Sequence, residues 1–316
     1  NFDVNFGNDL ESQPWEIVYH AAICADNLLK VIPESFDFNN KLLNNLVENI
    51  CTNLVYPHSW VCLACSRAMG IFLSRIDSSQ MTIVESNSKK TNFIRTKNGF
   101  FRLISNSVKQ IDKPNVNSDL AEQTVKNLIW ATKAIEGNRN LSVILKHVEN
   151  ESDLLVWLIK KMSMIGRKKY AENKKAVFDY FASVCQFLSK DIILKNLLNI
   201  VYPMRMAVWE ESKNQTESGK IYVKVEGKGN VSLNELALDV LDTVEDRVGS
   251  VFLLEAITKV NDKLLAKKDG ATSSRDKTKS SKDSFSNSVK GAVGSKRKAA
   301  RMSKKKMKKF KEDWEL

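Results

Sequence analysis

The hydrophobic positions of this chain follow the 3.6-residue period of an α-helix along most of its length. Near the N-terminus, small or apolar side chains recur every three or four residues at Ile17, Ala21, Cys24, Leu28 and Val31, which predicts a helix with this face buried. The same spacing returns in later stretches. They are residues 43–54, 62–76, 121–135, 155–165, 177–188, 233–244 and 253–264.

The stretches between these helices are short and polar, and glycine (12) and proline (5) are scarce for 316 residues. Strand-rich folds need frequent turns built from those two residues. The pattern therefore predicts an all-α fold with about ten helices, because helices of three to five turns would fill the chain. Successive amphipathic helices without intervening strands are typical of an α-solenoid of HEAT-like antiparallel helix pairs.

A similarity between two short segments supports a repeat. The segment "NLVYPHSWV" (53–61) resembles "NIVYPMRMA" (199–207), and the two begin 146 residues apart. This distance fits four units of about 37 residues, a length near that of helical-pair repeats.

Composition divides the chain into three parts. We expect helical repeats in residues 1–268, with polar insertions near 77–96 and 212–231, the second of which is compatible with a short hairpin. Residues 269–295 are rich in Ser, Lys and Asp and nearly free of apolar side chains, which predicts a disordered linker. Residues 296–316 form a basic tail.

The net charge of +12 is concentrated at the C-terminus. Residues 269–316 contain 15 Lys and Arg against 6 Asp and Glu, whereas the preceding residues are nearly balanced, with 34 against 31. This asymmetry favours a polyanionic partner that is contacted largely through the tail. No apolar run is long enough to span a bilayer, so we expect no membrane partner.

The segment "KRKAARMSKKKMKKFK" (296–311) has ten basic residues and no acidic residue. Its two Lys/Arg clusters suit a two-part nuclear import signal, and such a density also binds phosphate backbones without reading sequence. The candidate residues for RNA phosphate binding or import are Lys296, Arg297, Lys298, Arg301, Lys304, Lys305, Lys306, Lys308, Lys309 and Lys311.

A second basic cluster lies within the helical part and surrounds a predicted helix end. Cations near a helix C-terminus are stabilised by the helix dipole, so a structural role and phosphate binding are equally consistent with this cluster. Its residues are Lys160, Lys161, Arg167, Lys168, Lys169, Lys174 and Lys175.

The stretch "HSWVCLACSRAMG" (58–70) contains a C-x-x-C pair, a histidine and a tryptophan. A structural zinc site needs four ligands, and no second pair is present. Cys62 and Cys65 continue the apolar row to Met69, Phe72 and Ile76, so we predict that both thiols pack in the core. We expect no metal, no cofactor and no catalytic residue, and an odd number of cysteines favours a reducing compartment.

Taken in order, several segments resemble the C-terminal end of a known family. They are "VYPHSWVCLACSRAMGIF", "SDLLVWLIKKMSMIGRKK", "VFDYFASVCQFL" with "VYPMRMAVWEE", and the tail. The family is that of the giant HEAT-repeat small-subunit processome proteins called "down-regulated in metastasis". The resemblance implies a non-catalytic nucleolar scaffold that binds pre-rRNA, the small nucleolar ribonucleoprotein and other ribosome-assembly proteins during processing of 18S rRNA.

Two features complete the expectations. The family pattern P-H-x-W-V-R-L appears here with Cys62 in place of Arg, which removes one expected polar contact between repeats. Because the sequence starts at Asn1, we expect an excerpt of a longer chain, whose upstream repeats would cover an apolar face near residues 1–35. The alternative function is a protein-only α-solenoid adaptor for transport or signalling, whose basic tail is only an import signal.

Overall fold

A computed structural model describes residues 14–33, 40–78, 81, 93–137, 153–213, 221–225 and 229–279, and these ranges contain ten α-helices and one β-hairpin. The chain divides into two compact units, residues 1–264 and 265–316. The helices are α1 (Trp15–Val31), α2 (Lys41–Asn53), α3 (Ser59–Ser74), α4 (Lys97–Asp112), α5 (Ser118–Gly137), α7 (Leu154–Gly166), α8 (Ala171–Phe187), α9 (Lys190–Lys213), α10 (Leu233–Val248) and α11 (Ser250–Lys279).

Side chains that cap backbone amides fix where several helices begin. The side-chain oxygens of Asn40, Thr96 and Asp153 accept hydrogen bonds from the first free amides of α2, α4 and α7. Ser232 and Glu235 form a reciprocal capping box at the start of α10. These polar residues stop one helix pattern and start the next, which produces separate helices instead of a few long ones.

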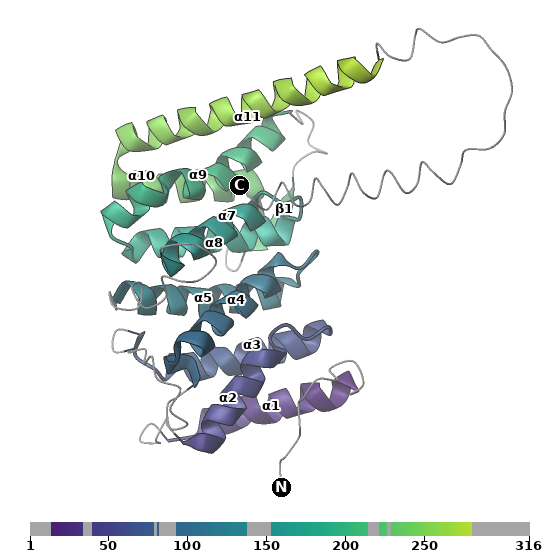
Figure 1. The fold of residues 1–316 in the computed structure, drawn as a ribbon, viewed down its shortest axis with the longest axis vertical. Coiled ribbons are helices and arrows are strands. Elements are labelled where there is room, and N and C mark those ends of the chain that lie inside the picture. The colour runs from purple at the N-terminus through teal and green to yellow at the C-terminus, as the bar shows by residue number, and fades with distance from the viewer. Residues whose placement is uncertain are drawn as a thin grey trace, which may run out of the picture. The chain divides into compact units, whose positions relative to one another are not determined.

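The helices of the first unit pack as pairs in two layers (Figure 1). One layer contains α1, α3, α5, α8 and α10, each in contact with the next, and the second contains α2, α4, α7 and α9 in the same relation. The pairs are α2 with α3, α4 with α5, α7 with α8, and α9 with α10. The predicted all-α fold of sequential helix pairs is therefore confirmed.

Polar side chains, most of them buried, join neighbouring pairs through hydrogen bonds, mostly to backbone carbonyls. These bonds give the buried side-chain donors partners that they would otherwise lack. The bonds run from Asn106 to the Cys51 carbonyl (2.9 Å), from Asn127 to the Ser66 carbonyl (2.9 Å), from Asn173 to the Ile111 and Lys113 carbonyls, between Thr132 and Tyr180 (2.9 Å), and from Arg247 to the Leu188 carbonyl (2.8 Å).

Cys62 stands where the family pattern has arginine, yet a polar contact between helix pairs is present at this position. Lys113, just after α4, donates from Nζ to the Tyr56 carbonyl at 2.9 Å and to the Cys62 Sγ at 3.2 Å. The Cys62 thiol in turn donates to the Tyr56 carbonyl at 3.0 Å. A lysine from the next pair thus supplies the cation that position 62 lacks.

The face predicted for the first helix is wrong. Ile17, Leu28 and Val31 are 62%, 51% and 74% exposed, and Ala21 and Cys24 are exposed as well. The helix instead buries the residues one position further on, because apolar and small side chains occur on both faces of α1 and spacing alone does not choose between them. The buried residues are Val18, Ala22, Ala25 and Leu29.

The two similar segments do not mark equivalent positions. Val55 to Pro57 lie in the turn between α2 and α3, whereas Pro203 lies inside α9. The second-layer helices begin at Lys41, Lys97, Leu154 and Lys190, at unequal intervals. The 37-residue period is therefore wrong, although the helix pairs that it was meant to explain are present.

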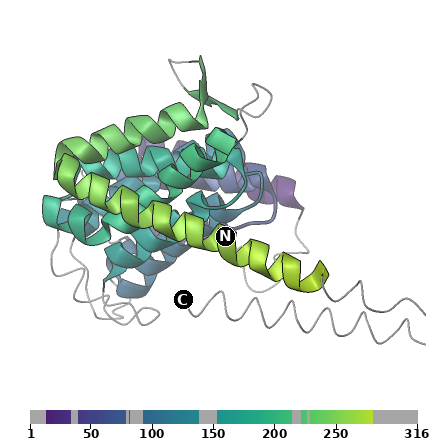
Figure 2. The same cartoon turned by 90° about the horizontal axis from the view of Figure 1, so that it is seen from above.

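Only parts of the two polar insertions lie within the described ranges. A 3₁₀ turn (η2, Phe93–Arg95) lies at the end of the first. In the second, β1 (Tyr222–Val225) pairs antiparallel with β2 (Gly229–Ser232), with Val223 opposite Val231, which is the hairpin that the sequence allowed. Figure 2 shows the hairpin standing beyond the helices of the first unit. α11 continues to Lys279, past the predicted end of the helical part at residue 268.

Candidate nucleic-acid interface

The basic tail that carries most of the candidate phosphate contacts lies outside the described residues. The same holds for His147, one of the three histidines. The structure therefore describes only the second cluster, at residues 160–175, which spans the second half of α7, the following turn and the start of α8.

Two lysines of this cluster are buried in ion pairs. The Lys174 side chain is 3% exposed and its Nζ contacts Glu210 of α9. The Lys175 side chain is 11% exposed, with Nζ 3.0 Å from Asp179 one turn further along α8. A buried ammonium needs a partner of this kind, since an unpaired charge away from water is costly. In this conformation neither ammonium group is available to a phosphate.

Arg167 and Lys168 also have partners within the chain. The Arg167 guanidinium lies over the Tyr202 ring at 4.1 Å and donates to Ser163 Oγ at 2.9 Å. Burial lowers the pKa of Arg167, while the neighbouring Tyr202 opposes this shift. Lys168 Nζ is 2.5 Å from Asp112 of α4, and both side chains are 43% exposed. These contacts join the α7–α8 turn to its neighbours, as cations at a helix end often do.

The remaining lysines of the cluster lie closer to solvent. Lys160 and Lys169 are exposed, and Lys169 Nζ is 5.5 Å from the centre of the Tyr170 ring. Lys161 is half-buried, with Nζ 5.6 Å from the centre of the Trp157 ring. The structure thus separates the cluster by exposure: Lys174 and Lys175 are buried, Lys161 and Arg167 are half-buried, and Lys160, Lys168 and Lys169 are exposed, although Lys168 pairs with Asp112. Sequence spacing did not reveal this division, because two of the three carboxylates, Asp112 and Glu210, come from the distant helices α4 and α9.

The C-x-x-C stretch packs in the core, as predicted. Cys62 is 0% and Cys65 2% exposed, and Met69, Phe72 and Ile76 are buried in the same row. Burial raises the pKa of both thiols, and for Cys62 the nearby Lys113 ammonium partly opposes the rise. A buried thiol with a raised pKa is a poor nucleophile.

The histidine of the same stretch belongs to an aromatic cluster instead of a thiol site. The His58 ring stacks on Trp15 with centroids 3.9 Å apart, and Trp60 lies edge-on to both. Among the described residues, no three His, Cys, Asp or Glu side chains gather in a way that would hold a metal ion. None of the helices in the described ranges combines the length and apolarity that a bilayer crossing needs.

Part of this chain is similar to known proteins. Residues 32–185 match the protein family described as "Small subunit processome component 20 homolog, C-terminal". The chain is also 23% identical over 225 residues to the U3 small nucleolar RNA-associated protein 20 of Schizosaccharomyces pombe, an alignment that covers 70% of this chain and 8% of that protein. The family match runs from the end of α1 into α8 and so includes three helix pairs.

Proposed function

We propose that this chain, which belongs through residues 32–185 to the C-terminal family of small subunit processome component 20 homologues, is a scaffold of the small-subunit processome in 18S rRNA processing. The observation that carries the proposal is that the family match falls on the packed helix pairs themselves. A non-catalytic role fits the described core, where four thiols and the buried tyrosine Tyr180 have pKa values raised by burial.

The proposed RNA contact rests chiefly on the tail. Ten cations in residues 296–311, first among them Lys304 to Lys306 with Lys308 and Lys309, would neutralise phosphates and release counterions. The exposed Lys160, Lys168 and Lys169 would add a smaller contact on the helical part, for which Lys168 would exchange its partner Asp112 for a phosphate. The name of the fission yeast relative ties that protein to U3 small nucleolar RNA, and we extend this association to the nucleolus, pre-rRNA, the small nucleolar ribonucleoprotein and assembly factors for this chain.

Ultraviolet crosslinking in cells, followed by sequencing of the bound RNA, tests this function. The intact protein is compared with a variant that lacks residues 269–316 and carries an unrelated nuclear import signal in their place. We expect crosslinks concentrated on small-subunit precursor rRNA, thinned by the deletion. A nuclear protein that crosslinks to no precursor rRNA would contradict the proposal.

A second candidate function is a protein-only adaptor whose tail serves import alone. The carboxylates around the body cluster favour it, since Asp112, Asp179 and Glu210 neutralise cations that an RNA-binding face would leave free. The same crosslinking experiment separates the two, because an adaptor would reach the nucleus and bind proteins without enriching precursor rRNA.

The exposed apolar row of α1 fits a further helix pair. Helical repeats bury their apolar faces against neighbours, and Ile17, Leu28 and Val31 lie on the face of α1 that no helix of the described residues covers. We propose that upstream repeats of a longer parent chain cover this row. Hydrogen exchange should show weak protection of α1 in this chain and strong protection when the preceding sequence of the parent is present. Equal protection in both would contradict it.

A further inference from the structure

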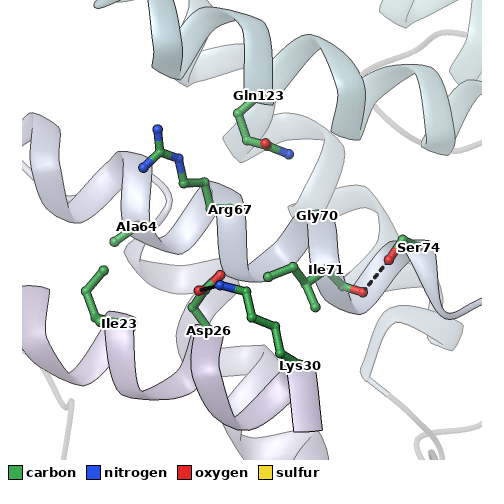
Figure 3. A pocket seen from close by; sticks show the side chains of 9 residues that line it. All are labelled: Ile23, Asp26, Lys30, Ala64, Arg67, Gly70, Ile71, Ser74 and Gln123. Carbon is green, nitrogen blue, oxygen red and sulfur yellow. Dashed lines mark hydrogen bonds and ion pairs between the residues drawn. The ribbon is translucent and has the colours of Figure 1, made fainter. Parts of the chain in front are cut away.

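Two adjacent hollows lie on the face of the first unit formed by α1, α3, α5 and α8. The first hollow, of about 390 Å³, is bounded by α1, α3 and α5 (Figure 3). The second, of about 400 Å³, extends over α3 and α5 to Lys175 at the start of α8 and to Lys224 on β1. Arg67 and Gln123 line both hollows, so the two form one continuous depression across successive helices.

Helical spacing places polar side chains on this face in each helix. Asp26 and Lys30 are one turn apart on α1, Arg67 and Ser74 are two turns apart on α3, and α5 presents Glu122, Gln123 and Lys126. The opposite faces of α3 and α5 form the core. The depression is therefore built mainly from polar faces of the three successive helices α1, α3 and α5.

Arg67 has the loosest ion pair among the paired cations of the depression. Lys30 and Lys126 each pair with a carboxylate one turn away on the same helix, at 2.5 and 2.7 Å. The Arg67 guanidinium is 3.7 Å from Asp119, and the two side chains are 54% and 68% exposed. A loose pair in open solvent holds little free energy, so Arg67 retains the ability to bind another carboxylate through two parallel hydrogen bonds.

Gly70 keeps the floor of the depression open beside Arg67. A Cβ at this position would lie 2.4 Å from Gln123 Nε2 and 3.0 Å from Asn127 Oδ1. Figure 3 shows the Gln123 side chain reaching from α5 toward α3 at this point. The Gln123 amide, which donates to Asn127 Oδ1 at 3.2 Å, presents both a donor and an acceptor, the pair of groups that a peptide backbone offers in return.

We propose that this depression binds an extended acidic peptide segment of a partner protein, with one carboxylate of the peptide on Arg67 and its backbone on Gln123. Packed helices lie about 8–10 Å apart and an extended chain advances about 3.3 Å per residue, so the three spacings from α1 to α8 take about seven to nine residues. Asp26, Asp119 and Glu122 lie among the cations of the depression. They would repel a continuous phosphate backbone, whereas a peptide can place its acidic side chains between them.

Fluorescence anisotropy tests the proposal with a labelled peptide of about nine residues that alternates glutamate and serine, and with an RNA oligomer of equal charge. The full chain is compared with Arg67→Glu and Arg67→Gln. The matched control is Lys259→Glu, since Lys259 is an exposed lysine of α11 paired one turn away, as Lys126 is. We expect Arg67→Glu to weaken peptide binding about tenfold and Arg67→Gln less, with the control within about twofold. A photoreactive residue in the peptide should crosslink to α3 and α5.

Crosslinks confined to residues 296–311, or an equal loss in Arg67→Glu and Lys259→Glu, would overturn the proposal, since binding would then depend on net charge alone. Stronger binding of the RNA oligomer with the same dependence on Arg67 would also overturn it and assign the depression to nucleic acid. The inference is independent of the processome role. In the proposed function, precursor rRNA crosslinking in cells depends on the tail, which Arg67 variants leave unchanged.

Discussion

Replacing Asn173 by alanine should destabilise the protein more than replacing a buried asparagine that is hydrogen-bonded only within its own helix. Asn173 is 0% exposed, and its Nδ2 donates to the carbonyls of Ile111 and Lys113, at the end of α4. The last carbonyls of a helix have no partner within that helix. Without Asn173, one buried acceptor (Ile111) and one partly buried acceptor (Lys113) lose their hydrogen bonds.

The magnitude follows from those two acceptors. Leaving a buried polar group unsatisfied costs about 1–3 kcal/mol, and water entering the small cavity would recover part of this. We therefore expect Asn173→Ala to lower the free energy of unfolding by about 2–4 kcal/mol. Asn173→Asp should cost more, since it keeps the shape but turns an acceptor toward two carbonyls.

Asn196 provides the control. It is 2% exposed, and its Nδ2 donates to the Ile192 carbonyl at 3.0 Å, four residues back in α9. That carbonyl is already satisfied by the backbone amide of the helix, so Asn196→Ala should cost only about 1 kcal/mol. Urea unfolding followed by circular dichroism and by tryptophan fluorescence measures both. If both alanine variants lost the same free energy of unfolding, burial alone would explain the loss, and the hydrogen bonds between helix pairs would not.

Three further predictions concern burial. Leu29→Ala should cost about 2–5 kcal/mol, whereas Leu28→Ala, at a side chain that is 51% exposed, should cost less than about 0.5, and equal costs in urea unfolding would contradict the face assigned to α1. Gly166→Ala should cost about 1–3 kcal/mol, because its Cβ would lie 2.8 Å from Pro203 Cβ; an unchanged melting temperature would show that α7 and α9 can separate freely. In native protein at pH 8, a thiol reagent should modify the exposed Cys24 rapidly and the other four cysteines only after unfolding. Burial raises the pKa values of those four thiols, to about 12 for Cys51 and Cys185. Rapid reaction of more than one thiol in the native protein would contradict this. The four are Cys51, Cys62, Cys65 and Cys185.

Much of the fold was predictable because periodicity records burial directly. The rows that include Leu128, Met162 and Phe181 are buried as predicted, and the C-x-x-C pair lies in the core. Periodicity failed at α1, where Val18 and Leu29 are buried beside the exposed Ile17 and Leu28. A helix with two apolar faces gives the same signal in either orientation, and only the neighbouring helix decides which face packs.

The candidate site was less predictable, since it depends on side chains that meet across helices. A count of cations placed Lys168, Lys174 and Lys175 in one basic patch. In the structure each pairs with a carboxylate, which comes from α4, α9 and α8 respectively. The importance of Lys113 was also hidden, because only the structure brings it to Cys62. Single side chains near a helix end carry no sequence signal for partners about 50 or 60 residues away, which belong to the next repeat.

The hydrogen bonds that Asn106, Asn127, Thr132, Asn173 and Arg247 make between helix pairs join residues 48 to 62 positions apart. In the first unit, helix packing likewise connects each pair only to its neighbours in the chain. Such a chain can assemble vectorially, because a newly synthesised pair finds its docking surface already formed by the pair that left the ribosome before it. The entropy of closing each contact stays the same however many pairs precede it. Length can therefore be added to a protein of this design without slowing the folding of the pairs already present.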